Sequence, residues 1–175
     1  MGKLLKIGWH VLYVKSRHEH KVDGLLKEAG LQSFLPLVKT VRTWSDRKKV
    51  IDVPLFPSYV FVMIENAKDF YNASSINGAC TFIKCGSVYA TIRESEIQKI
   101  KFLLDSDGIE DIQNSTELLE KGELVMIQYG AFTGMECEIL NVNNNNKIVV
   151  RIDSINQNIT ATLPSHYLSK LSKAI

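Results

Sequence analysis

The stretch Leu55-Phe56-Pro57-Ser58-Tyr59-Val60-Phe61-Val62 carries the strongest strand pattern in this chain of 175 residues. Its continuation predicts one β-strand over residues 55–64. Because side chains alternate along a strand, Tyr59, Phe61 and Met63 share one face, and the opposite face is also apolar. Either both faces are packed inside the protein, or one of them is a docking surface for a partner.

The flanking sequence predicts an α+β domain that ends near residue 104. Strands or extended segments are expected at residues 9–15, 31–36, 39–44, 80–85 and 88–92. Helices are expected at residues 22–29, ended by Gly30, and at residues 66–74. A capping-box pattern at Thr91-Ile92-Arg93-Glu94 predicts a further helix with Ile97, Ile100 and Leu104 on one face.

The sequence beyond residue 104 changes character twice. Residues 105–123 hold seven acidic residues and one basic residue, and we expect residues 105–119 to form a linker. From residue 124 to residue 163, thirteen of forty residues are Val, Ile or Thr, with turn signals about every ten residues. This spacing is typical of a small all-β barrel over residues 120–175, in which residues 143–146 form a hairpin loop.

The net charge of +2 conceals an asymmetry along the chain. Residues 1–60 contain eleven Lys or Arg against five Asp or Glu, whereas residues 61–175 contain ten against fourteen. A basic half of this kind is typical of a surface that meets a polyanion, although plain surface solubility explains the charges equally well.

Several classes of protein are excluded or disfavoured. No apolar run reaches the roughly 18–20 residues of a membrane span, so we expect no membrane partner. Three cysteines without CxxC spacing are typical of reduced thiols in a cytoplasmic protein. No phosphate loop or nucleophile elbow is present, so an enzyme is not expected. The pair in His18-Glu19-His20 lacks a nearby third ligand, so we predict a solvated helix start and no metal.

A second stretch, the strand-like residues 122–127 followed by Gly130-Ala131-Phe132-Thr133-Gly134, makes the pattern specific. In this order, the two stretches resemble the NusG family of transcription elongation factors over nearly the whole chain. The N-terminal part is similar to an NGN domain through these motifs: Trp9 with Tyr13, Phe34-Leu35-Pro36, residues 55–62 and Phe82-Ile83-Lys84. The Leu-Phe-Pro-x-Tyr form and the basic first helix are closer to the RfaH-type and UpxY-type regulators of polysaccharide operons.

The resemblance implies an NGN α/β sandwich with an antiparallel sheet over residues 1–104 and an SH3-like KOW barrel over residues 120–175. Family members bind the clamp helices of the RNA polymerase β′ subunit through an apolar cavity. By position, the residues implied to line this cavity are Tyr59, Phe61, Phe56, Ile97 and Ile100. Ser74 and Ser75 lie near the segment that touches the gate loop of the β subunit.

The resemblance also implies contact with the non-template DNA strand. The residues at the matching positions or beside them are Tyr13, Lys15, Arg17, His18 and Lys21. Cations for phosphates and an aromatic ring for an unstacked base suit single-strand recognition. The KOW motif is implied at Gly130, Phe132 and Gly134, with Rho or a ribosomal protein as its partner.

These assignments describe a monomeric antitermination factor that suppresses pausing and termination at polysaccharide-type operons and needs no cofactor. Two alternatives remain open from the sequence. One is a general NusG-like elongation factor, and the other is a KOW-containing ribosomal or RNA-binding module, against which the acidic second half argues.

Overall fold

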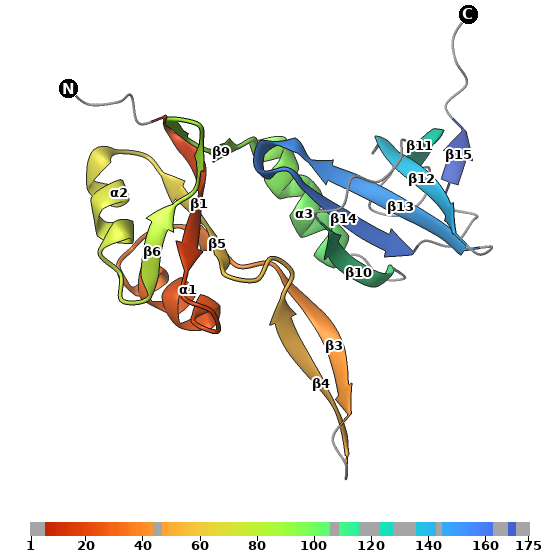
Figure 1. Ribbon diagram of the computed structural model, residues 1–175, viewed down its shortest axis with the longest axis horizontal. Helices are drawn as coiled ribbons and strands as arrows, with labels where there is room; N and C mark the ends of the chain where they lie inside the picture. Colours follow the sequence, from red (N-terminus) through yellow and green to blue (C-terminus); the bar gives the residue numbers. More distant parts are fainter. Residues whose placement is uncertain are drawn as a thin grey trace, which may run out of the picture. The chain divides into compact units, whose positions relative to one another are not determined.

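The computed structural model describes residues 6–43, 47–105, 109–115, 123–127, 136–142, 145–162 and 168–170. The chain divides into two compact units, Met1–Ile97 and Gln98–Ile175, and the division falls within helix α3, Glu94–Asp105 (Figure 1). Each unit contains an antiparallel sheet, and the strands of one sheet do not pair with those of the other.

The sheet of the N-terminal unit has five strands with β1 at its centre. They are β1 (Gly8–Val14), β2 (Ser33–Phe34), β5 (Tyr59–Ile64), β6 (Ala79–Phe82) and β9 (Thr91–Ile92). Their order is β2-β5-β1-β6, and β9 also pairs with β1. All of these pairings are antiparallel, which confirms the predicted α+β unit.

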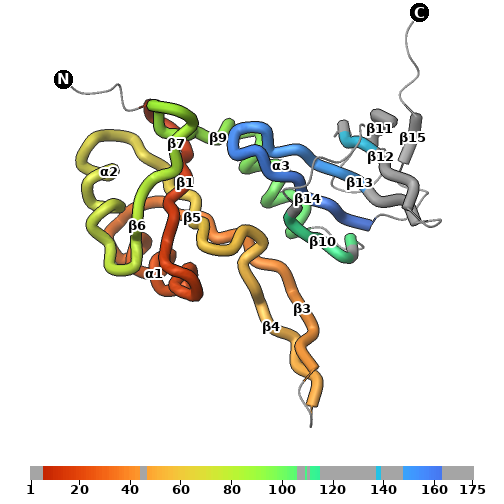
Figure 2. Tube along the Cα trace, in the orientation of Figure 1, coloured from red at the N-terminus to blue at the C-terminus, as the bar shows by residue number. Residues whose placement is uncertain are grey.

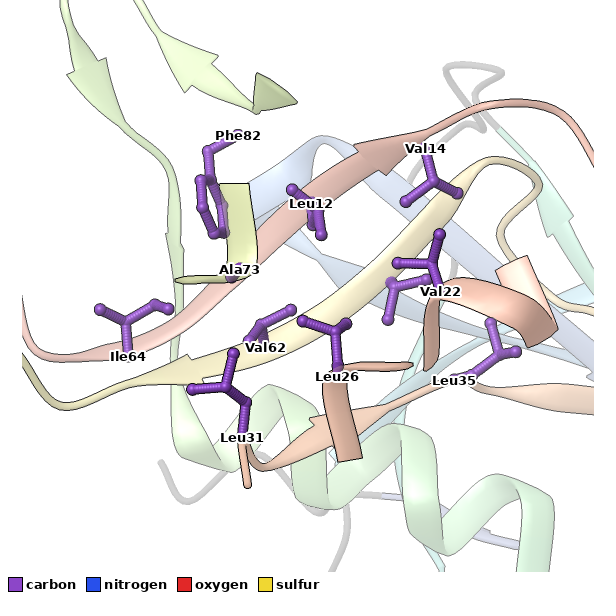
Figure 3. Packing of buried hydrophobic residues seen from close by; sticks show 11 residues of the cluster. Leu12, Val14, Val22, Leu26, Leu31, Leu35, Val62, Ile64, Ala73 and Phe82 are labelled. Atoms are coloured by element: carbon purple, nitrogen blue, oxygen red, sulfur yellow. The ribbon is translucent and has the colours of Figure 1, made fainter. Parts of the chain in front are cut away.

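Two helices, α1 (Glu19–Glu28) and α2 (Ala67–Ser74), cover one face of this sheet (Figure 3). Val22 and Leu26, one turn apart on α1, pack in the same buried cluster as Ala73 of α2 and Leu12 and Val62 of the sheet. The side chain of Asn66 caps α2 by accepting a hydrogen bond from the backbone N–H of Asp69 at 3.0 Å. The predicted helix at residues 66–74 is thereby confirmed.

The strand expected over residues 55–64 is shorter than predicted. It begins at Tyr59, because Ser58 has a left-handed φ of 64°, a conformation that a strand does not contain. Residues 55–58 form a turn between β4 (Lys48–Pro54) and β5. β4 pairs along its full length with β3 (Leu37–Thr43), and the two make a separate hairpin that projects from the unit (Figure 2).

The hairpin predicted between residues 80–85 and 88–92 is confirmed in its inner part. β7 (Lys84–Cys85) pairs with β8 (Val88–Tyr89) across the two-residue turn Gly86-Ser87. Gly86 has a φ of +61°, the left-handed conformation that glycine adopts at no steric cost.

Helix α3 begins two residues later than the predicted capping box. The backbone N–H of Arg93 donates to Glu96 Oε2 at 3.0 Å, so the glutamate half of a capping box is made at Arg93, and Thr91 stays in β9. Leu103 is fully buried, whereas Leu104 is only half-buried, so the inward face of α3 differs by one residue from the prediction.

The C-terminal unit contains a six-stranded sheet of order β10-β14-β13-β12-β11-β15. Its strands are β10 (Glu110–Ser115), β11 (Glu123–Ile127), β12 (Glu136–Val142), β13 (Asn145–Ile152), β14 (Gln157–Thr162) and β15 (Leu168–Lys170), with a 3₁₀ turn at Asp153–Ile155. The pairings described for this sheet form an open path. The predicted strand-rich unit is confirmed, whereas the closed barrel stays a prediction.

Part of the expected linker belongs to this sheet. β10 lies inside residues 105–119 and pairs with β14. Strand pairing uses backbone N–H and C=O groups, so the polar side chains of β10 do not prevent it. The loop expected at residues 143–146 is also shorter, since Val142 and Asn145 already pair across the hairpin. The KOW-motif residues Gly130, Phe132 and Gly134 lie outside the described residues.

Candidate functional site

An aromatic pair lies across β1 and β5, at the end of the sheet nearest α1. Tyr13 and Tyr59 are directly opposite in the register, and their rings meet edge to face with centroids 6.0 Å apart. Tyr13 is 42% exposed, although it belongs to the central strand of the sheet. Thr81, its partner on β6, is exposed as well, so this row of the sheet presents a free tyrosine ring to solvent.

The chain leaves β1 through a basic loop. Lys15 and Arg17 of this loop and Lys21 in the first turn of α1 are all exposed, and Arg17 has a left-handed φ of 63°. The loop is tied to the sheet because the backbone N–H of Lys15 donates to the carbonyl of Gly78 at 2.9 Å. Together with the half-buried His18, these residues follow Tyr13 directly, so the predicted DNA-binding residues lie in one continuous segment.

Glu19 connects the start of α1 to the turn before β5. The side chain is 6% exposed, and its Oε1 accepts a hydrogen bond from the backbone N–H of Ser58 at 2.8 Å. Burial of a carboxylate is costly unless hydrogen bonds compensate for the lost water. Local pattern did not predict this role, because Glu19 belongs to a segment that was expected to be a solvated helix start.

The remaining aromatic residues of the β5 face are buried. Phe61 is 0% exposed and packs against Phe56 and Phe34, with ring centroids 5.6 Å and 6.0 Å away. Tyr59 is half-buried. Ile97 and Ile100, the other two residues expected at the polymerase cavity, are also fully buried. Among the aromatic rings named here and in the adjoining β1 row, that of Tyr13 is exposed, and those of Tyr59 and Phe34 are half-buried.

Ser74 and Ser75 end α2 and are exposed. Both hydroxyls donate to backbone carbonyls one turn earlier, of Phe70 at 2.7 Å and of Tyr71 at 2.9 Å. Tyr71 is 72% exposed, and sequence reasoning had not selected it. The segment that follows these serines reaches the basic loop, because the carbonyl of Gly78 accepts the hydrogen bond from the backbone N–H of Lys15.

The titratable side chains of the described residues were expected to form no metal site. No group of three or more His, Cys, Asp or Glu side chains is arranged to hold a metal ion there. Cys80 and Cys85 are exposed, whereas burial raises the pKa of Cys137 to about 11, with a smaller opposing effect of Lys99. No helix among the described residues has the length and hydropathy that a membrane span requires.

Comparison with known proteins identifies the family. The family model described as "Transcription termination factor nusG" matches residues 8–101, which is more than half of the chain. The chain belongs to the NusG family. A search of curated proteins gave no match.

A solved NusG structure has a similar fold. The structure described as "Domain interaction in Thermotoga maritima NusG" matches with 21% identity and a TM-score of 0.55, over 95% of this chain and 98% of that chain. The MjSpt4:Spt5 complex in conformation A matches with 16% identity and a TM-score of 0.33, over 94% of this chain and 99% of that chain.

The NusG-family match covers the residues singled out in the N-terminal unit. Residues 8–101 include the Tyr13–Tyr59 pair, the basic loop after β1 and the buried aromatic cluster around Phe61. The match ends before the C-terminal sheet, which has its own ion pair between Arg151 and Glu138 at 2.8 Å. The hydrogen bond to Glu138 raises the pKa of Arg151, a guanidinium that stays protonated in proteins.

Proposed function

We propose that this NusG-family protein is an elongation and antitermination factor that binds RNA polymerase and reduces pausing and termination. The observation that carries the proposal is the exposed Tyr13 ring, beside Tyr59 and directly followed by Lys15 and Arg17. An aromatic platform next to cations suits single-stranded nucleic acid. Such a strand is available where polymerase holds its DNA open.

The polymerase contact in this proposal is the β5 region. Tyr59 supplies the accessible part, and the packed rings of Phe61 and Phe56 give this region a rigid base. Ile97 and Ile100 are the further residues proposed for this contact, and both are buried. Rigid aromatic residues are common hot spots in protein interfaces because they lose little conformational entropy on binding. The β′ clamp helices are the proposed partner here, and Ser74 and Ser75 are the proposed contact with the β-subunit gate loop.

The protein would act through binding energy and not through a chemical step. A factor that binds the elongating state of polymerase more tightly than the paused state shifts the population toward elongation. Contacts on both sides of the DNA cleft would favour the closed clamp. The basic loop, in this proposal, holds the non-template strand through Tyr13, Lys15, Arg17, His18 and Lys21.

The C-terminal unit is proposed to be a KOW barrel that recruits Rho or a ribosomal protein. Its described strands would form the barrel wall, and the sequence motif Gly130, Phe132 and Gly134 would form a turn of it. The Leu-Phe-Pro-x-Tyr motif at residues 55–59 favours a regulator of polysaccharide-type operons over a general factor.

The test of the proposed function is binding of the full chain to core RNA polymerase and to its β′ clamp helices. Tyr59→Ala should weaken binding by about 2 kcal/mol or more, as truncation of an interface hot spot does. Tyr59→Phe is the matched control, because it keeps the ring and should bind like the parent. A folded Tyr59→Ala variant with the parent's affinity would contradict the proposed contact.

A further inference from the structure

The β3–β4 hairpin is a two-stranded sheet that no third described strand joins (Figure 1). Seven residue pairs run from Leu37 opposite Pro54 to Thr43 opposite Lys48. In its outer part, every described residue from Lys39 to Thr43 and from Arg47 to Val50 is exposed. An isolated hairpin with both faces exposed to solvent is only marginally stable in water. The outer part of this hairpin therefore adds little to the stability of the unit, and its length calls for another explanation.

Charge sets this hairpin apart from the rest of the chain. Its segment, residues 37–54, contains five Lys or Arg and two Asp, a net charge of +3 that exceeds the +2 of the whole protein. The cations are Lys39, Arg42, Arg47, Lys48 and Lys49. All five are exposed, and none forms an ion pair among the residues that the structure describes.

One pair of these cations opposes the stability of the hairpin itself. Arg42 and Lys49 lie directly opposite each other in the register, on the same face of the ribbon. Like charges in this arrangement repel and destabilise a strand pair. The opposite face bears Val41 and Val50, also directly paired, with 59% and 57% of each side chain exposed. A bound polyanion would relieve the repulsion, and contact with it would cover the valines.

The shape of the hairpin selects among nucleic acids. A two-stranded ribbon fits the major groove of B-form DNA, which is about 12 Å wide, but not the narrow major groove of double-stranded RNA. Exposed valines can contact thymine methyl groups, which major-groove edges present.

We propose that the β3–β4 hairpin binds double-stranded DNA, with its cations on the phosphates and the ribbon in the major groove. This second nucleic-acid surface is distinct from the single-strand surface at Tyr13 and Lys15. It goes beyond the proposed function, because it requires no polymerase. A duplex-binding hairpin would hold closed DNA next to an opened strand.

The test uses the full chain and a 20-base-pair DNA duplex, with binding followed by fluorescence anisotropy between 50 and 200 mM salt. The variant Arg42→Gln/Lys49→Gln removes the opposed cations, and Lys27→Gln/Lys68→Gln is the matched control elsewhere on the same unit. Each lost phosphate contact lowers the salt slope for B-DNA by about 0.9. The hairpin variant should therefore lose about 1.8 from the slope, and its affinity change between the two salt concentrations should be about tenfold smaller.

The hairpin variant should remain folded, because it removes a repulsion, and its melting temperature should equal or exceed the parent's. Duplex affinity that falls in the hairpin variant and not in the control supports the proposal. Unchanged duplex affinity and slope overturn it. An equal loss of affinity for the separated single strand, or equally tight binding of an RNA duplex, overturns the assignment to double-stranded DNA.

A variant of the basic segment after β1 distinguishes the hairpin surface from the proposed single-strand site. Lys15→Gln/Lys21→Gln should weaken binding of single-stranded DNA and leave the contribution of the hairpin to the duplex slope intact. If this variant abolishes the duplex slope instead, the duplex contact belongs to the basic loop and the hairpin proposal fails. Polymerase binding by Tyr59→Ala is measured apart from both, so the two proposals can fail independently.

Discussion

Glu19 Oε1 lies 2.8 Å from the backbone nitrogen of Ser58 and accepts its hydrogen bond. The two residues are thirty-nine positions apart in sequence. Ser58 has a left-handed φ of 64°, so the carboxylate stabilises the strained turn from which β5 starts. Glu19 is also the first residue of α1, the helix that follows the basic loop. One hydrogen bond thus couples the proposed DNA-binding segment to the strand of the proposed polymerase contact.

Removal of this hydrogen bond should destabilise the N-terminal unit. Glu19→Ala leaves the N–H of Ser58 without its partner, and we expect a loss of about 1–3 kcal/mol in the free energy of unfolding. Glu19→Gln keeps an acceptor oxygen and should cost less. Chemical denaturation measures both, with Glu28→Ala, an exposed residue at the end of the same helix, as the control. Equal stability of Glu19→Ala and the parent would contradict the coupling.

Replacement of two glycines of the N-terminal unit by alanine should change the free energy of unfolding in opposite directions. Gly78 has a φ of +104°, and a Cβ there would stand 2.9 Å from Val22 Cγ2 in the core. We expect Gly78→Ala to lower stability by about 1–3 kcal/mol. Gly24 lies within α1 with open space around it, so Gly24→Ala should raise stability by about 0.5–1 kcal/mol. Thermal unfolding of both variants measures the two effects. A shift of the melting temperature in the same direction in both variants would contradict the close packing at Gly78 or the open space at Gly24.

The exposed Tyr13 ring should contribute to single-strand binding through stacking. Truncation of a stacking residue costs about 1–3 kcal/mol per base, so Tyr13→Ala should bind a single-stranded oligonucleotide about tenfold more weakly. Tyr13→Phe keeps the ring and should bind nearly as well as the parent. Weakening by both variants to the same extent would show that the hydroxyl, and not stacking, makes the contact.

The basic loop should govern the salt dependence of that binding. Each cation that meets a phosphate contributes about 0.7 to the salt slope on single strands. Lys15→Gln/Arg17→Gln/Lys21→Gln should therefore reduce the slope by about 2. Titrations with a fixed oligonucleotide at several salt concentrations measure the change. An unaltered slope in a folded triple variant would exclude the loop from the interface.

The thiol of Cys137 should be protected in the folded protein. Burial raises its pKa from 9.0 to about 11, so its neutral form is favoured by folding. The folded state then binds more protons than the unfolded state between these values. The stabilisation is fully present below pH 9 and is lost as the pH rises through about 11.

A thiol reagent at pH 8 checks this directly. Cys80 and Cys85 are exposed and should react at once in the native protein, whereas Cys137 should react only after unfolding. Cys137→Ser serves as the control, since it removes the slow thiol and keeps the two fast ones. Three fast thiols in the native parent would contradict the burial of Cys137.

Local pattern predicted those elements whose signals lie within a few residues. The Gly86-Ser87 hairpin follows from turn chemistry, and α2 follows from the Asn66 cap and the apolar spacing after it. The residues 55–62 motif led to the NusG family, which the match over residues 8–101 confirms. The signals for these features come from residues that are close in sequence, so they could be predicted without knowledge of tertiary contacts.

Long-range contacts decided the rest. Periodicity did not show whether one face of β5 is a docking surface, and the packed structure buries Phe61 on one face and Val62 on the other. It leaves Tyr13 of the neighbouring strand β1 exposed. The acidic segment around β10 shows no strand pattern, yet it pairs with β14, because backbone groups and not side chains make the ladder. Glu19 appeared to be a solvated charge until folding brought the N–H of Ser58 to it. Sequence alone determined the family and the local elements, and the tertiary structure decided which side chains are available to a partner, because burial is a property of the packed chain.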